Sequence, residues 1–150
     1  MSEKKLITDF SFPETPVQLS RGYAGGFAVA IHPTENMIAT ISYDHYYKKF
    51  HLELLKYNNG ANYNLVNSWK LDFTSEPGHH IHNPDSVDIQ FSPNGKWLLL
   101  HSKERFDNRK IFLIDLSSKA IYTHDTGYTA INGITFTEDS NHLICLYDDY

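Results

Sequence analysis

The chain has 150 residues, of which 41% are hydrophobic and 14% aromatic, enough apolar material for one core but not for two typical domains. Its net charge is -5 and its 13 basic residues are spread along the sequence, which excludes the clustered positive charge typical of nucleic-acid-binding proteins. Residues 1–12 lack the apolar run of a signal peptide, and no segment approaches the roughly 18 apolar residues of a membrane span, so we expect a soluble, cytoplasmic protein that binds neither nucleic acid nor membrane.

Short strand patterns begin near the N-terminus. Residues 6–12 can form a strand, which ends where two prolines follow. After a glycine-rich loop, residues 27–31 and 37–42 predict two strands around a polar turn. The two strands expected next cover residues 50–56 and 63–71. This part of the chain therefore predicts one lone strand and then a meander of four strands.

The middle of the chain has the clearest pattern. Residues 87–91 alternate apolar and polar side chains, the period of a strand whose two faces differ in chemistry. The turn at 92–95 reads Ser-Pro-Asn-Gly, in which proline fixes one φ angle and Asn-Gly accepts positive φ angles, so a tight reversal is predicted. Residues 97–100, 111–114 and 120–123 then predict three further strands.

One arrangement occurs three times: an apolar strand, a tight polar turn and a returning strand. The first strands of these units cover residues 27–31, 87–91 and 131–136. Their last residues are 60 and 45 positions apart, and the second interval is close to the repeat length of about 40–45 residues in propeller blades. A long hairpin turn and a loop at 74–86 account for the longer first interval. Because no segment shows helical periodicity, we expect an all-β chain.

The turn in the second unit resembles a motif of the WD-repeat β-propeller family. Phe91-Ser92-Pro93-Asn94-Gly95-Lys96 is similar to the family's turn between inner strands, and Ile114-Asp115-Leu116 stands where the family has Trp-Asp. Since Ile114 replaces the tryptophan, the family's hydrogen-bonded tetrad of His, Asp, Ser/Thr and Trp is incomplete here. The resemblance implies blades made of antiparallel four-stranded meanders. Similar turns also occur in Tol-type periplasmic propellers and in the propeller domains of serine peptidases.

On this resemblance the chain holds about two and a half β-propeller blades. The first blade would cover about 22–72, the second about 84–124 and an incomplete third about 128–150, while residues 1–20 would supply a ring-closing strand. Propellers close with typically four to eight blades. We therefore expect either a piece of a longer chain or a protomer whose ring closes by self-association, because an open stack exposes apolar faces.

Few groups in the sequence suit catalysis or metal binding. His79, His80 and His82 are conceivable zinc or copper ligands, but no second ligand cluster accompanies them, and such loop histidines are usually only polar. The single cysteine, Cys145, lies in an apolar run and is expected to be buried. Neither a Gly-x-Ser-x-Gly motif nor a phosphate-binding loop occurs. We expect no catalytic residue, no metal and no cofactor.

Tyrosine and arginine are frequent in the loops that would share one edge of the predicted blades. These loops are 20–26, 42–49, 73–86, 102–110, 124–130 and 147–150. Both residue types are enriched at protein interfaces because they combine a large contact area with a polar group, although some tyrosines would only cover strands. The residues expected to bind another protein or peptide are Arg21, Tyr23, Tyr43, His45, Tyr46, Tyr47, Arg105, Phe106, Arg109 and Tyr128.

Two classes of function remain open. The WD-repeat resemblance implies a non-catalytic protein-protein interaction scaffold, as in most members of that family. The alternative is the propeller portion of an enzyme, either a serine-peptidase-associated propeller or a lactonase-like one with a metal in its central channel. Further blades alone would favour the scaffold, whereas a downstream Gly-x-Ser-x-Gly or inward-pointing Glu, Asn and Asp would favour the enzyme.

Overall fold

The computed structural model describes residues 28–44, 49–58, 62–71, 87–102, 110–127 and 131–147. These segments form ten β-strands and contain no helix, so the predicted all-β class is confirmed for them. In the same segments there is no helix of the length and apolar character that crossing a membrane requires. The lone strand expected at residues 6–12 lies outside the described residues.

The first sheet has four antiparallel strands in the order of the sequence. They are β1 (Ala28–Ile31), β2 (Met37–Asp44), β3 (Lys49–Asn58) and β4 (Asn62–Leu71). Every second residue at the start of β3 is apolar, and Phe50, Leu52 and Leu54 are buried on one face of the sheet. A β-bulge between Leu54 and Leu55 interrupts the alternation, so both of these neighbouring leucines are buried.

The second sheet repeats this topology, and the third sheet has two described strands. The second sheet contains β5 (Val87–Phe91), β6 (Trp97–Ser102), β7 (Lys110–Asp115) and β8 (Ile121–Asp125). The third sheet contains β9 (Ile131–Phe136) and β10 (Leu143–Tyr147). All neighbouring strands pair antiparallel, which confirms the four-stranded antiparallel meanders expected for the first two units.

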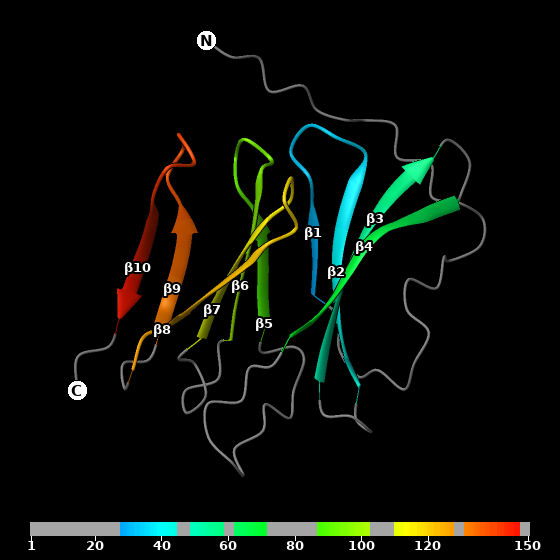
Figure 1. The fold of residues 1–150 in the computed structure, drawn as a ribbon. Coiled ribbons are helices and arrows are strands. Elements are labelled where there is room, and N and C mark those ends of the chain that lie inside the picture. The colour runs from blue at the N-terminus through cyan, green and yellow to red at the C-terminus, as the bar shows by residue number, and fades with distance from the viewer. Residues whose placement is uncertain are drawn as a thin grey trace.

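The three sheets lie side by side, with the second sheet between the other two (Figure 1). Its contact with the first sheet includes one large apolar cluster, in which Leu98, Leu100 and Ile114 pack with Ile41 and Leu52. All five of these side chains are fully buried. Burial of apolar surface between the two sheets is therefore the main attraction that joins them.

The second sheet also uses its other face. Leu99 and Ile111 point away from the first sheet and pack with Ile131 and Ile134 of the third. This two-sided burial explains why β6 contains three successive leucines rather than an alternating pattern, because strands covered on both faces have near-continuous apolar runs.

The described sheets form an open stack and not a closed ring. On the outer side of the first sheet lies the first end face, which we define by Val29 and Ile31. On the outer side of the third sheet lies the third end face, which we define by Ile144 and Leu146. These four side chains are exposed aliphatics with no described sheet against them.

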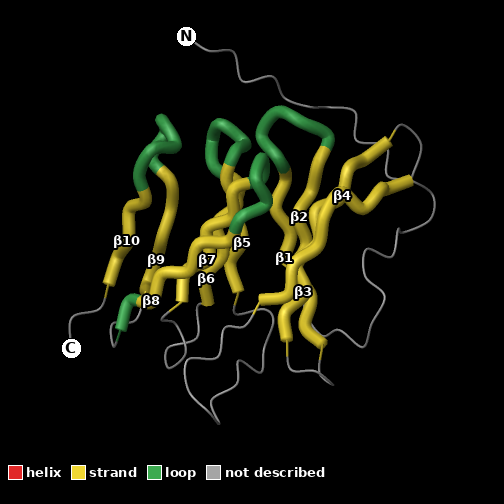
Figure 2. The backbone as a smooth tube through the Cα atoms, viewed as in Figure 1, coloured by secondary structure: helices red, strands yellow, loops and turns green. Residues whose placement is uncertain are grey.

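The two ends of the strands define two edges of the stack. The turn edge carries the turns at 32–36, 92–96 and 137–142, which Figure 2 shows along one side of the molecule. The loop edge is the opposite one, where β2, β4, β6 and β8 end and where β3, β5, β7 and β9 begin. The connections between successive sheets therefore start and finish at the loop edge.

Candidate functional site

Three turns of the turn edge share one backbone frame. In each turn, the N–H of the first residue after the strand donates to the carbonyl of the residue five positions later, at 2.9 Å. The donor and acceptor pairs are His32 and Met37, Ser92 and Trp97, and Thr137 and His142. The three turns are thus equivalent in their sheets, and residue numbers can be matched from one sheet to the next by counting from these pairs.

Side-chain oxygens complete the turn of the second sheet. Ser92 Oγ accepts a hydrogen bond from Trp97 N at 3.0 Å, and Asn94 Oδ1 accepts one from Lys96 N at 3.0 Å. Gly95 has a φ angle of 72°, a conformation that glycine adopts without steric cost. The motif Ser-Pro-Asn-Gly therefore forms the tight reversal that its residue types predict.

The turn of the third sheet reproduces this network with different residues. Thr137 Oγ1 accepts from His142 N at 3.1 Å, as Ser92 does in its own turn, and Asp139 Oδ1 accepts from Asn141 N at 3.0 Å. Ser140, with a φ angle of 62°, takes the place that glycine has in the second sheet. One hydrogen-bonding pattern therefore holds both turns although their sequences differ.

The turn of the first sheet uses an imidazole instead. The N–H groups of Thr34 and Glu35 donate to His32 Nδ1 at 3.3 and 2.9 Å. Since Nδ1 accepts, the proton is on Nε2, which donates to the carbonyl of Gly95 at 2.9 Å. The His32 ring also meets the Phe91 ring edge-on, with centroids 5.0 Å apart. This histidine therefore closes its own turn and also ties the first sheet to the second.

A second set of polar contacts ties the second sheet to the third. Asn94 N donates to Ser140 Oγ at 3.0 Å, and the Gln90 amide donates to the carbonyl of Ile134 at 2.8 Å. Thr135 Oγ1 in turn donates to Gln90 Oε1 at 3.2 Å. The positive-φ residues of the second and third turns thus each touch the turn before them: Gly95 contacts His32 of the first turn, and Ser140 contacts Asn94 of the second. The turn edge acts as a clamp between sheets.

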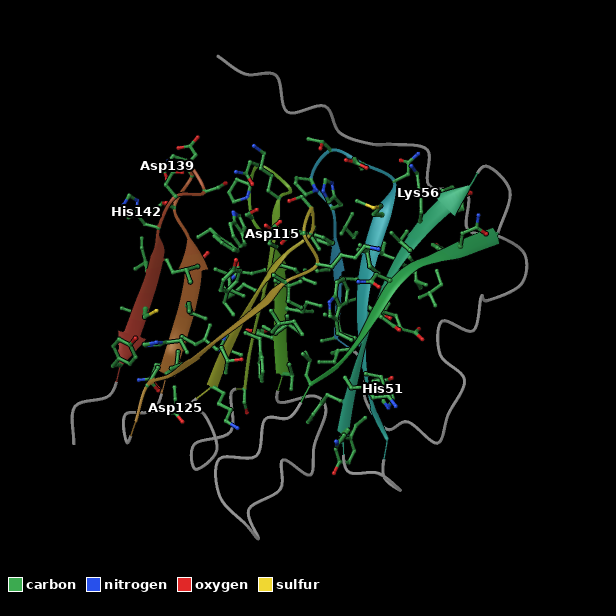
Figure 3. The ribbon with its side chains drawn as sticks, viewed as in Figure 1. His51, Lys56, Asp115, Asp125, Asp139 and His142 are labelled. Carbon is green, nitrogen blue, oxygen red and sulfur yellow. The ribbon has the colours of Figure 1, made fainter. Side chains whose placement is uncertain are left out.

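Two carboxylates have lowered pKa values: Asp139, in the turn of the third sheet, and Asp115, at the end of β7. The Thr137 hydroxyl, above all, lowers the pKa of Asp139 from 3.8 to about 2. The hydroxyls of Ser117 and Ser118 lower the pKa of Asp115 from 3.8 to about 2 in the same way. Figure 3 shows Asp139 on the β9–β10 turn, away from Asp125 at the loop edge. Both carboxylates are therefore ionised at neutral pH and serve as hydrogen-bond acceptors within their turns.

The loop edge is where the sequence predicts partner binding. Tyr43 is the one predicted residue that the described segments contain, and it is only 5% exposed, with its ring centroid 4.9 Å from that of Phe50 in the apolar cluster. Its phenyl ring therefore anchors β2 in the core. The other predicted residues lie outside the described segments: Arg21, Tyr23, His45, Tyr46, Tyr47, Arg105, Phe106, Arg109 and Tyr128.

No metal-binding constellation of three or more His, Cys, Asp or Glu side chains occurs within the segments that the structure describes. The histidines at 79, 80 and 82 lie outside those segments. Cys145 is half-buried and packs against the cluster between the second and third sheets. This cysteine therefore has the packing role that its apolar neighbours predict.

The chain matches no protein-family model, and comparison with curated proteins finds no similar sequence. The described structure offers two edges and two end faces of the stack as candidate binding surfaces. Sequence patterns indicated the loop edge but not which residues make up the end faces. The alternation in Leu143–Tyr147 carries that signal, because its even-numbered aliphatic residues point away from the second sheet.

Proposed function

We propose that this chain is a non-catalytic protein-protein interaction scaffold of the WD-repeat propeller type, which binds another protein or peptide through its loop edge. The observation that supports the proposal is the repetition of one sheet-to-sheet contact. The first and second sheets, and then the second and third, meet through an apolar cluster and through the equivalent turn residue. Face-to-face stacking of antiparallel meanders is how propeller blades are assembled.

The extents of the described sheets also support the proposed blades. The second sheet spans Val87 to Asp125, against an expected blade at about 84–124, and the third sheet begins at Ile131 within the expected 128–150. In this interpretation β1, β5 and β9 are the inner strands. Each of them is followed by one of the three equivalent turns.

The loop edge is the better candidate for binding because the turn edge is committed to internal bonds. Ser92, Asn94, Thr137 and Asp139 all use side-chain oxygens to hold their own turns, and Ser140 uses its hydroxyl to hold the neighbouring turn. The loop edge instead receives the longer connections between strands. Loops that a rigid scaffold holds can vary in sequence without cost to the fold, and they commonly carry function.

Alanine substitutions in the predicted loops test this proposal. A partner would first be co-purified with the chain and identified, and its Kd would then be measured against Tyr46→Ala, Tyr47→Ala and Arg105→Ala. Each variant should lose roughly 1–2 kcal/mol or more of binding free energy, because aromatic and arginine anchors dominate such interfaces. The melting temperature should stay nearly constant, since loop substitutions rarely alter stability by much.

Matched control variants lie on the turn edge. Thr34→Ala and Glu138→Ala change exposed side chains at the opposite end of the strands and should leave the Kd unchanged. If these controls weaken binding while the three loop variants do not, the binding surface is the turn edge. Hydrolysis of a substrate by the purified chain, abolished by a single substitution, would instead support the enzyme alternative.

A further inference from the structure

The two end faces expose aliphatic side chains at positions where a solvent-facing sheet usually has polar residues. On the first end face, Val29 is 49% exposed and Ile31 is 71% exposed. On the third end face, Ile144 is 52% exposed and Leu146 is 63% exposed. Each pair alternates with residues that pack inward, so both faces belong to regular strands and not to irregular loops.

Counting from the equivalent turns shows what the third end face corresponds to in the other sheets. Ile144 matches Leu99 of the second sheet and Ala39 of the first, and both of these residues are completely buried. Leu146 matches Ile41 in the same way, at a position that is also completely buried in the first sheet. In the first two sheets this face covers the next sheet of the stack. The third end face therefore has the composition of an interface that receives a following sheet.

The first end face corresponds to the faces of the second and third sheets that pack against the preceding sheet. Ile31 matches Phe91 of the second sheet and Phe136 of the third, and each of those rings packs against the cluster shared with the preceding sheet. Val29 matches Ile134, which is buried against the second sheet. The first end face therefore has the composition of an interface that packs on a preceding sheet.

From these equivalences we propose that a second copy of this chain docks its first end face on the third end face, in a head-to-tail arrangement. The contact continues the one that already joins the first sheet to the second and the second to the third. Because the two end faces differ, the interface is heterologous. All copies in the array then have the same orientation, and they form a closed ring if the rotation between neighbouring copies allows it. This assembly goes beyond partner binding at the loop edge and does not depend on it.

Charge at the rim of the contact should oppose this assembly. Glu35 has the place in its turn that Ser140 has in the third, and Asp139 has the place of Asn94. Since Ser140 touches Asn94 within the chain, the same contact between copies would bring Glu35 close to Asp139. Two carboxylates at short range repel each other, and salt screens them. Added salt should therefore strengthen the assembly, and so should the neutral variant Glu35→Gln.

Sedimentation of two single-face variants and their mixture tests the proposal. Wild-type chain should pass from monomer to dimer and larger species over a roughly hundredfold rise in concentration. Ile31→Lys and Leu146→Lys should each weaken self-association by at least about tenfold, because a buried lysine replaces an aliphatic contact. Mixing the two variants should restore a 1:1 dimer that does not grow, since one intact face of each kind remains.

The controls separate this arrangement from other occupants of the end faces. Ile121→Lys makes the same change on the middle sheet and should leave self-association intact, and circular dichroism should show all variants folded. A wild-type chain that stays monomeric throughout would overturn the proposal and leave the faces to a different protein or segment. Dimers of one single-face variant alone would overturn it in favour of a symmetric contact. Loop-edge variants such as Tyr46→Ala should assemble like wild type.

Discussion

At the scale of single residues, Gly95 is the described glycine at which an added Cβ would meet the closest contact. Its φ angle of 72° is one that side-chain-bearing residues rarely adopt, and an added Cβ would lie 2.3 Å from Cε1 of His32. His32 cannot move away without losing its bond to the Gly95 carbonyl. The glycine is therefore required both by the turn and by the approach of the neighbouring sheet.

Gly95→Ala should destabilise the chain by about 2–3 kcal/mol, the sum of left-handed strain and a disrupted hydrogen bond. Gly127→Ala is the matched control, since Gly127 has a φ angle of 75° but nothing within 4 Å of an added Cβ. The control should lose only about 1 kcal/mol. Urea denaturation of the two variants measures the difference, and equal losses would mean that the His32 contact contributes nothing.

Asp139 should make stability depend on pH in the acid range. Its pKa is lowered to about 2 in the folded chain from an ordinary value of 3.8, so its contribution is complete above 3.8 and is lost as the pH falls towards 2. Carboxyl-carbon NMR should show this titration near pH 2. Asp139→Asn should abolish the titration and keep the turn, because Asn94 makes the same backbone bond as a neutral amide. A midpoint near 3.8 would contradict the proposed hydrogen bonds.

Among the elements, residues 87–91 and 97–100 could be predicted closely from the sequence, because alternation, Ser-Pro-Asn-Gly and a leucine run all agree. The third sheet's turn was harder to anticipate in detail. Residues 137–142 contain no glycine, yet Ser140 adopts the positive φ angle, and its hydroxyl accepts a hydrogen bond from Asn94 N of the second sheet. Such a contact depends on two segments that are 46 residues apart, and no local pattern records it.

Predictions for the candidate site depended on tertiary packing in the same way. Tyr43 follows a predicted strand, and a tyrosine at this position is compatible either with a binding loop or with the core. Its phenyl ring lies against Phe50 because the alternation of β2 directs it inward. The alternation in Leu143–Tyr147 indicates which side chains share the third end face, but it does not indicate that this face is exposed. Ile144 and Leu99 are both aliphatic, and only the position of each sheet in the stack determines that Leu99 is buried and Ile144 is exposed.

At the scale of the whole molecule, the stacked arrangement predicts the order in which the three sheets unfold. Stability in a linear array is approximately a sum over neighbouring contacts, so an end sheet breaks one contact when it detaches and the middle sheet breaks two. Among described residues, the cluster between the second and third sheets is the smaller one. Amide hydrogen exchange should therefore be fastest through local detachment of β9 and β10, while the amides of β2, β3 and β6 exchange last. Uniform protection across all three sheets would show that the chain melts as one unit.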